Sequence, residues 1–448
     1  MAVVTRPLRL VALLALLAAP VAARADDDAP AGWSGANDLW ALHAQATLTW
    51  QGHPAFTSPY SGPNSLNPSA NGRETFDATL YAGLHPWAGG EIWVDPEIDQ
   101  GFGLSNTLGA AGFPSGEAYK VGAAAPYAKL QRLFLRQTVD LGGARAKTDA
   151  DLNQFPGEQT ADRLVLTVGK LSVVDIFDTN GLAHDPRQDF LNWSLIDAGS
   201  FDYASNAWGY TVGAAAEWYT GPWTLRAGVF DLSAEPNSTE LDWSFHQVQF
   251  VGEIERRYRL GGRDGDLKFT GFPSRGRMGT FADAIALSQS TGQPADLAPV
   301  RRFRSRPGVS FDLQQGLTQD LGAFLRGGLA SGSVEPFDFA DIDRTISGGL
   351  SLAGSAWGRK DDRVAVAGVI NQISRVHQQF LAFGGVGILV GDGQLPHPGP
   401  EQILETYYSV AAARFVHISL DYQFIDHPAY NRDRGPVSVL GVRLHGQF

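Results

Sequence analysis

The sequence contains no cysteine, and this absence excludes several classes of protein. Without thiols the chain has no disulfides, no cysteine nucleophile and no thiolate ligand for a metal. The ten histidines are scattered, and the sequence has no HExxH or GxSxG motif. We therefore expect no catalytic site, no cofactor and no resident metal.

Long apolar runs are also absent beyond the N-terminus, so the sequence predicts no membrane-spanning helix. At the N-terminus itself, two arginines precede an apolar run that begins at Leu10 and is too short to span a bilayer. Ala23 and Ala25 then provide a small-x-small cleavage site. We predict that residues 1–25 are a signal peptide that is removed on export.

Cleavage after Ala25 changes the formal charge from −12 to −15, because it removes three arginines and no acidic residue. A chain with this net negative charge does not attract the phosphate backbone of a nucleic acid, which argues against a nucleic-acid partner. An exported chain without cysteine is typical of the bacterial envelope. We predict that residues 26–40 are a periplasmic N-terminal segment and that residues 41–448 form one domain in the outer membrane of a Gram-negative bacterium.

What the sequence does contain is alternation of apolar and polar residues with the period of two that is typical of β-strands. In the last segment, Leu440, Val442 and Leu444 fall on one side, while Arg443 and His445 fall on the other. Such segments are each near the roughly 9–11 residues of a tilted membrane strand. About 16 of them lie near residues 41–51, 75–85, 89–95, 130–141, 162–171, 208–219, 222–231, 246–260, 265–272, 308–316, 321–331, 344–353, 363–372, 402–412, 414–424 and 436–448.

Short and long connections alternate along the chain, as they do in barrels with tight periplasmic turns and long external loops. Only the linker 142–161 is longer than this rule expects. The long connections are residues 52–74, 96–129, 172–207, 273–307 and 373–401. The predicted fold class is therefore all-β: a transmembrane antiparallel β-barrel of about 16 strands, wide enough for its lumen to be a channel and not a packed core.

Three positions test this interpretation. Gln137 and Arg256 fall on faces that we expect to meet lipid, which indicates either a place near a membrane interface or a local slip of register. The chain ends on Phe448, which closes an alternating strand. This ending resembles the signal that outer-membrane assembly machinery reads, so we predict that machinery as a partner.

Several long stretches resemble the carbohydrate-selective outer-membrane porins, the OprB-like family. They include DPEIDQGFGLSNTLGAAGFPSGEAYKVG (95–122), LTVGKLSVVDIFDTN (166–180), DFLNWSLIDAGSFDYASNAWGYTVGAAAEWY (189–219) and DHPAYNRDRGPVSVLGVRLHGQF (426–448). The resemblance implies a 16-stranded porin that passes monosaccharides such as glucose into the periplasm by passive diffusion, without a cofactor. It does not identify the sugar.

A pore for sugars needs polar groups spaced along its lumen, because charged side chains bond hydroxyl pairs and aromatic rings pack on a pyranose. Arg132 and Arg136 share one predicted inward face beside a strand that carries three further candidates, and we predict the constriction there. The alternative is a solvated wall whose charges pair across neighbouring strands. The predicted inward candidates are Glu91, Trp93, Asp95, Arg132, Arg136, Glu217, Arg226, Glu253 and Arg257, with Glu255, Asp312, Arg326, Glu405, Asp421 and Arg443 on further strands.

The connection 172–207 is the second candidate for a sugar contact, since one long loop often folds into a porin lumen. Asn180, Arg187 and Trp193 are its predicted binding residues. An external loop held by Asx turns is the alternative. The acids of this connection also leave open a calcium ion, although their spacing matches no EF-hand.

The sequence thus predicts a pore for small sugars, set in outer-membrane lipid, as a monomer or a homotrimer. A pore for another small polar solute, such as an organic acid, is the alternative within transport. Roughly balanced inward acids and arginines favour neutral solutes. A barrel that is an enzyme or a structural protein is the alternative from another class.

Overall fold

The computed structural model describes residues 39–118 and 122–448. The predicted signal peptide, residues 1–25, and most of the predicted N-terminal segment, residues 26–40, lie outside these residues. No helix in the two described ranges is long and apolar enough to cross a membrane.

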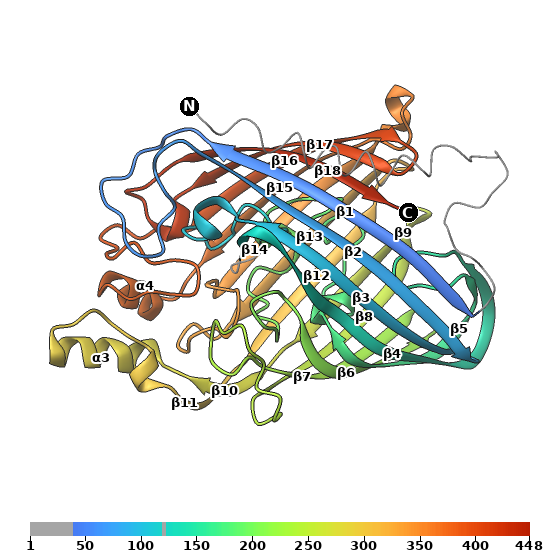
Figure 1. Cartoon of the computed structure of the whole chain (residues 1–448), viewed down its shortest axis with the longest axis horizontal. Coiled ribbons are helices and arrows are strands. Elements are labelled where there is room, and N and C mark those ends of the chain that lie inside the picture. Colours follow the sequence, from blue (N-terminus) through green and yellow to red (C-terminus); the bar gives the residue numbers. More distant parts are fainter. Residues whose placement is uncertain (1–38, 119–121) are drawn as a thin grey trace.

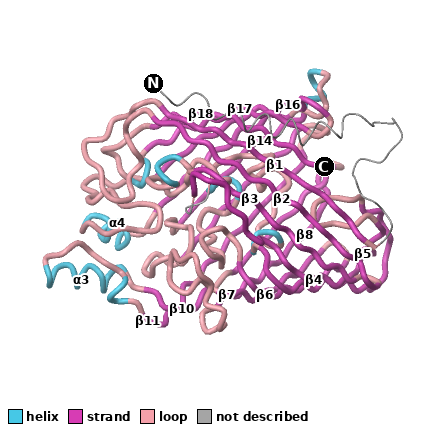
Figure 2. The backbone as a smooth tube through the Cα atoms, viewed as in Figure 1, coloured by secondary structure: helices cyan, strands magenta, loops and turns pink. Residues whose placement is uncertain are grey.

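The wall of the molecule is a closed antiparallel barrel (Figures 1 and 2). Each strand pairs with the next along the chain, β9 pairs with β12, and β18 returns to β1. A short hairpin, β10 (Ser274–Met278) and β11 (Arg302–Arg306), extends from the wall beside β8. The 16 wall strands are β1 (Trp40–His53), β2 (Asn71–Trp87), β3 (Gly90–Gly101), β4 (Ala123–Thr148), β5 (Gly157–Leu171), β6 (Thr211–Thr220), β7 (Trp223–Asp231), β8 (Val248–Leu260), β9 (Arg263–Gly271), β12 (Gly308–Gly316), β13 (Leu321–Ala330), β14 (Arg344–Ala353), β15 (Arg363–Gln372), β16 (Glu401–Ala413), β17 (Val416–Asp426) and β18 (Val437–Gln447).

Every predicted strand has its counterpart in this wall, so the predicted barrel of 16 strands is confirmed. The polar face points inward: on β1, Gln45, Thr47 and Thr49 are buried, whereas Trp50 is 45% exposed. In a soluble barrel the apolar face would be the buried one. The exposed apolar band is therefore the surface that meets lipid.

The connections differ between the two ends of the barrel (Figure 1). The long ones gather at one end, which is external in porins. They contain α3 (Phe281–Thr291) and α4 (Arg375–Ala382) and the short 3-10 helices η2 (Leu104–Asn106), η4 (Ala298–Val300) and η6 (Pro428–Tyr430). The opposite, periplasmic end has short turns such as residues 221–222 and 261–262, and a longer one, residues 354–362, that holds η5 (Gly354–Trp357).

The linker 142–161 is not an irregular loop. β4 continues to Thr148 and β5 begins at Gly157, with Lys147 paired to Glu158. Register shifts near Gly142, which has φ +107°, allow the long ribbon to bend. The linker is therefore an extended hairpin, and only residues 149–156 form its turn.

Gln137 and Arg256 do lie on the outer side, but close to the periplasmic turns. Gln137 accepts a hydrogen bond from the indole nitrogen of Trp87 at 2.8 Å, and the guanidinium of Arg256 lies 5.0 Å from the ring of Trp223. Tryptophan with a polar partner is typical of a membrane interface. The interface explanation holds for both residues, and neither marks a slip of register.

The lumen is not the open channel that strand number alone predicted. Two external connections fold into it: residues 172–210, here called the inner loop, and residues 102–118, here called the second inner loop. Their apolar side chains, among them Phe113, Phe190 and Trp193, join inward residues of the wall in the main hydrophobic cluster. Part of the lumen is therefore packed, and the open space is displaced to one side.

Candidate functional site

The inner loop is fixed to the wall by buried charges on β13, β16 and β18. The guanidinium of Arg326 donates to the carbonyls of Leu195, Asp178 and Ala183 at 3.1–3.2 Å. Glu405 accepts from the backbone nitrogen of Asn192 at 2.9 Å. Irregular backbone inside a barrel needs such partners, because an unpaired buried amide or carbonyl is costly.

Arg443 holds the middle of the inner loop in the same way. Its guanidinium donates to the carbonyl of Asp189 at 2.8 Å and to that of Gln188 at 2.9 Å. Arg326, Glu405 and Arg443 were predicted as lumen residues, and they do point inward. They hold backbone in place and are not open to a solute.

The second inner loop packs against the first. Its Phe113 ring stacks on Trp193, with centroids 5.3 Å apart and planes 8° from parallel. Gly112 lies so close to Ser194 that a Cβ at this position would clash with the serine hydroxyl oxygen. Glu401 of β16 accepts from the backbone of Ala111 at 3.0 Å and Gly112 at 2.7 Å. The two loops therefore form one packed unit against the wall strands β12–β18.

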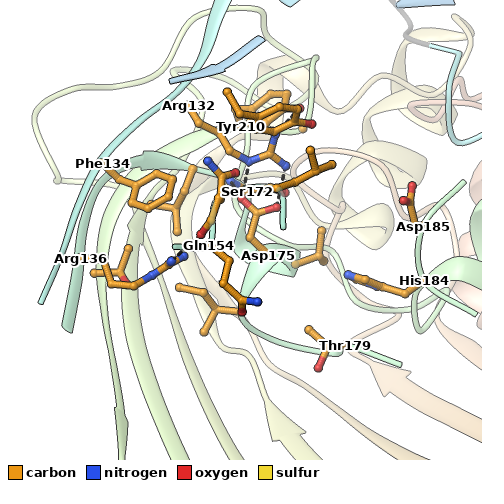
Figure 3. Close-up of a pocket in the computed structure, with 18 of the residues that line it drawn as sticks. Arg132, Phe134, Arg136, Gln154, Ser172, Asp175, Thr179, His184, Asp185 and Tyr210 are labelled. Carbon is orange, nitrogen blue, oxygen red and sulfur yellow. Dashed lines mark hydrogen bonds and ion pairs between the residues drawn. The ribbon is translucent and has the colours of Figure 1, made fainter. Parts of the chain in front are cut away.

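Opposite that packed unit, a cavity of about 670 Å³ separates the inner loop from the strands β3–β7. Figure 3 shows part of it. Its charged lining residues are Glu91, Glu117, Arg132, Arg136, Arg163, Asp175, His184, Asp185, Arg187, Asp197, Glu217 and Arg226. Its aromatic lining residues are Tyr81, Phe134, Trp193, Tyr203, Trp208, Tyr210 and Tyr219.

Arg132 bridges the cavity from the wall to the inner loop (Figure 3). Its guanidinium bonds both carboxylate oxygens of Asp175, in the 3-10 helix η3 (Val173–Asp175), at 2.7 and 2.8 Å. It also lies 5.0 Å from the ring centroid of Tyr210. Burial raises the pKa of Asp175, but the Arg132 guanidinium outweighs this effect and holds the pKa below its usual range. The pair is therefore charged, and it narrows the lumen.

Arg136 lies four residues further along β4, toward the periplasmic end. It donates to Glu91 at 3.2 Å and to the backbone carbonyl of Asn153 at 2.7 Å. Arg132 and Arg136 share a face because the register with β3 is unbroken between them. A bulge lies just before Arg132, where the register shifts between Asp95 and Pro96 and buried Gln131 is the extra residue.

Arg187 enters the cavity from the inner loop, as predicted for that connection. It forms ion pairs with Asp77 at 3.3 Å, Glu97 at 3.2 Å and Glu117 at 3.4 Å. Across the cavity, Glu217 pairs with Arg226 at 3.0 Å. Both predicted residues of that pair line the same space as Arg132.

Other predicted site residues lie away from the open space. Trp93 and Asp95 are completely covered. Asn180 donates to Asp312 at 2.9 Å, and Glu253 accepts from the backbone of Asp178 at 2.9 Å. Arg257 donates to the hydroxyl of Thr224 and the carbonyl of Gly221, by the periplasmic turn. Trp193 borders the cavity but is only 4% exposed.

Several residues that line the cavity were not among those predicted from the sequence. Gln45 and Tyr81 stand on the polar faces of strands that were predicted, so the alternation alone could have placed them. Trp208 and Tyr210 lie at the end of the inner loop, within the predicted segment 208–219 but on the face opposite to Glu217, so the alternation did not place them inward. Asp175 was one acid among many in its connection, and only the fold shows that it meets Arg132.

The charges of the cavity nearly cancel. Five arginines and one histidine face six carboxylates. Most of the arginines are paired, so the field offers no continuous positive track for an anion. In residues 39–118 and 122–448, no group of three or more histidine, aspartate or glutamate side chains is arranged to hold a metal ion.

A closed antiparallel barrel with an apolar outer band, inward loops and a polar side cavity defines an outer-membrane porin. The chain belongs to the OprB family of carbohydrate-selective porins, which matches residues 63–448. The fold and class implied by the sequence resemblance are thereby confirmed.

Solved structures show the same fold at low sequence identity. The high-pH structure of Pseudomonas putida OprB has a TM-score of 0.68 and 14% identity, covering 92% of this chain and 94% of that one. The low-pH structure has a TM-score of 0.50 and 11% identity, covering 92% and 93%. The outer-membrane channel DcaP of Acinetobacter baumannii has a TM-score of 0.50 and 9% identity, covering 94% and 100%. No curated protein matches the chain.

Proposed function

We propose that this porin conducts neutral saccharides of monosaccharide size, such as glucose, into the periplasm by passive diffusion. The observation that carries the proposal is the bidentate pair of Arg132 and Asp175 beside Tyr210 in a cavity whose charges nearly cancel. Such a pair presents donors and acceptors together, as a sugar hydroxyl requires.

The geometry also suits release. Arg132 and Asp175 satisfy each other when no solute is present, so a sugar exchanges hydrogen bonds and does not fill an empty charged site. The gain per hydrogen bond is then small, about 0.5–1.5 kcal/mol for a typical exchange. A conducted solute must bind weakly enough to leave.

The proposal also covers assembly and export. Phe448 pairs with Ala44 of β1 through both backbone groups at 2.9 Å, and its side chain is 40% exposed on the outer face. This placement suits a residue that assembly machinery can reach before the barrel closes. We further propose export through cleavage of residues 1–25, and a monomer or a homotrimer in the membrane.

The first experiment is single-channel recording in planar bilayers, with glucose titrated against potassium chloride and against gluconate. Saturable block by glucose, without block by gluconate, is expected. Block by gluconate but not by glucose would indicate that the conducted solute is an organic acid and not a saccharide. Turnover of phospholipid without any pore would contradict transport altogether.

The double variant Arg132→Ala with Arg136→Ala then locates the site. We expect weaker glucose block and higher conductance from an intact barrel, because both guanidinium groups that narrow the cavity from β4 are gone. Unchanged glucose block in this variant would place the saccharide site elsewhere.

A further inference from the structure

The turn between β4 and β5, residues 149–156, differs from the other periplasmic turns because it folds back into the barrel. It is here called the exit turn. It is longer than the turns at residues 221–222 and 261–262, which simply reverse the chain. A hairpin can close with two residues, so strand pairing does not require the extra length.

The tip of the exit turn is anchored by an apolar cluster inside the lumen. Leu152 and Phe155 pack against buried side chains of β1–β4, separate from the main hydrophobic cluster. The Phe155 ring lies 5.1 Å from that of Trp93 and 5.5 Å from that of His85. Gly83 makes room for them: a Cβ there would be 2.7 Å from Trp93 and 3.0 Å from Phe155.

Polar contacts fix the same tip at both sides. Asn153, with φ +51°, accepts from Arg136 through its carbonyl and donates to Asp95 at 3.2 Å. Asparagine tolerates this left-handed conformation better than most residues. Gln447 of β18 donates to Asp151 at 3.2 Å. The exit turn therefore reaches from β4 and β5 past β3, β2 and β1 to β18.

This path places the exit turn across the periplasmic side of the cavity. Leu152, Asn153 and Gln154 are among the residues that line the cavity. Figure 3 shows Gln154 between Arg136 and Asp175. A solute that has passed the pair of Arg132 and Asp175 therefore meets the amide groups of this turn next.

We propose that the exit turn is a size filter at the periplasmic end of the pore, with Leu152 and Phe155 holding it in place and Asn153 and Gln154 facing the solute. The filter is independent of the barrel wall, whose strands pair with one another without it. The inference rests on pore formation and not on which solute is preferred.

The first test removes the anchor. The double variant Leu152→Ala with Phe155→Ala frees the tip, so we expect at least a doubling of single-channel conductance. Liposome-swelling assays should show entry of trisaccharides that the unmodified porin excludes. Phe415→Ala, at the short turn between β16 and β17, is the matched loss of a ring and should change neither quantity.

Circular dichroism and heat-modifiable migration of the same preparations must show a closed barrel. A closed barrel with the conductance and the size limit of the unmodified porin would overturn the proposal. Glucose block of the unmodified porin is recorded in the same bilayers. If glucose does not block the unmodified porin, the proposed saccharide substrate is contradicted. The size limit can still be measured by liposome swelling.

The second test uses the absence of cysteine, which makes any introduced thiol unique. Gln154→Cys, treated with a bulky methanethiosulfonate reagent, should lose most of its current, because the label would stand in the exit. Asp149→Cys, at an exposed position of the same turn, should be labelled without this loss. Complete labelling of Gln154→Cys, verified by mass, with an unchanged current would overturn the proposal.

Discussion

Arg226 and Arg326 point into the same lumen from opposite parts of the wall, yet they have different tasks. Arg226 on β7 bonds carboxylates of neighbouring strands, Glu217, Glu253 and Glu255, at 2.7–3.0 Å, and it borders the cavity. Arg326 on β13 bonds Asp312 at 2.7 Å, and its other N–H groups donate hydrogen bonds to carbonyls of the inner loop. Its side chain is completely buried.

The same difference between exposed and loop-binding charges distinguishes two parts of the barrel wall. The strands β3–β7, here called the cavity wall, carry charges that a solute can reach. The strands β12–β18, here called the anchor wall, carry charges that satisfy loop backbone. An inward charge in a barrel is thus a candidate for transport only where no loop covers it.

The largest effect is expected from Arg326→Ala. It leaves Asp312 and Asp178 without their buried partner and frees three carbonyls of the inner loop. Breaking a buried pair in this way costs about 3–5 kcal/mol. We expect a lower free energy of unfolding, measured by denaturation in detergent, and a several-fold rise in conductance as the inner loop detaches.

Arg226→Ala is the comparison for that variant. It removes an arginine of the cavity wall, so we expect a shift toward cation selectivity while the inner loop stays in place. Equal gains of conductance in both variants would remove the distinction between the two walls.

The second prediction concerns Asp175→Asn, which keeps the shape of the constriction but exposes the charge of Arg132. A unit charge at about 4 Å is worth about 1 kcal/mol in water, and it attracts chloride while it repels potassium, so the permeability ratio of chloride to potassium should rise at least roughly fivefold. Reversal potentials in a salt gradient measure this ratio. Asp149→Asn, on the exposed side of the exit turn, should leave it unchanged.

The third prediction is a pH dependence of the inner loop. Burial lowers the pKa of His184, but its contact with Asp197 at 3.5 Å outweighs burial and raises the pKa to about 9, with Asp178 assisting and Arg326 opposing. Since this value is above the unfolded one, the stabilisation is complete below about pH 6.5 and is lost as the pH rises through 9.

Conductance should therefore increase between pH 8 and pH 10 as the contact of His184 with Asp197 weakens. His184→Gln should abolish this increase, because an amide does not titrate. An identical pH profile in that variant would assign the change to another group.

The smallest effect is expected from Trp193→Phe. Trp193 stacks on Phe113 and is nearly covered, so the structure favours a packing role over a sugar contact. Swaps that roughly conserve apolar volume usually cost less than about 1.5 kcal/mol. We expect the glucose concentration for half-maximal block to change less than about threefold. A tenfold loss of affinity would show that the indole touches the sugar.

The strands could be predicted closely, and the fold explains the one whose expected polar face is mostly apolar. The segment 363–372 has alanine and valine where other strands have polar inward residues. In the structure Ala365, Ala367 and Val369 face inward and join the main hydrophobic cluster, and α2 (Trp193–Ile196) of the inner loop packs against β14 and β15. The apolar inner face of this segment indicates that a loop packs against it, as on the rest of the anchor wall. The period of two alone does not show this.

The candidate site was predicted only in part. The patch of Arg132, Arg136 and Glu91 does line the cavity, whereas Trp93 and Asp95 on the same face are covered by the exit turn. The sequence showed the length of the linker 142–161, but not that its turn folds back. The roles of these residues in binding a saccharide remain predictions.

By itself, the sequence determined the strands, their two faces and the membrane that the outer face requires, because side-chain direction along a strand depends only on local geometry. Only the tertiary structure decided which inward residues meet a solute and which meet backbone. That division depends on contacts such as those of Arg326 with Ala183 and of Arg132 with Asp175, between segments far apart along the chain. No local pattern encodes such contacts, since they exist only once the inner loop has packed inside the closed barrel.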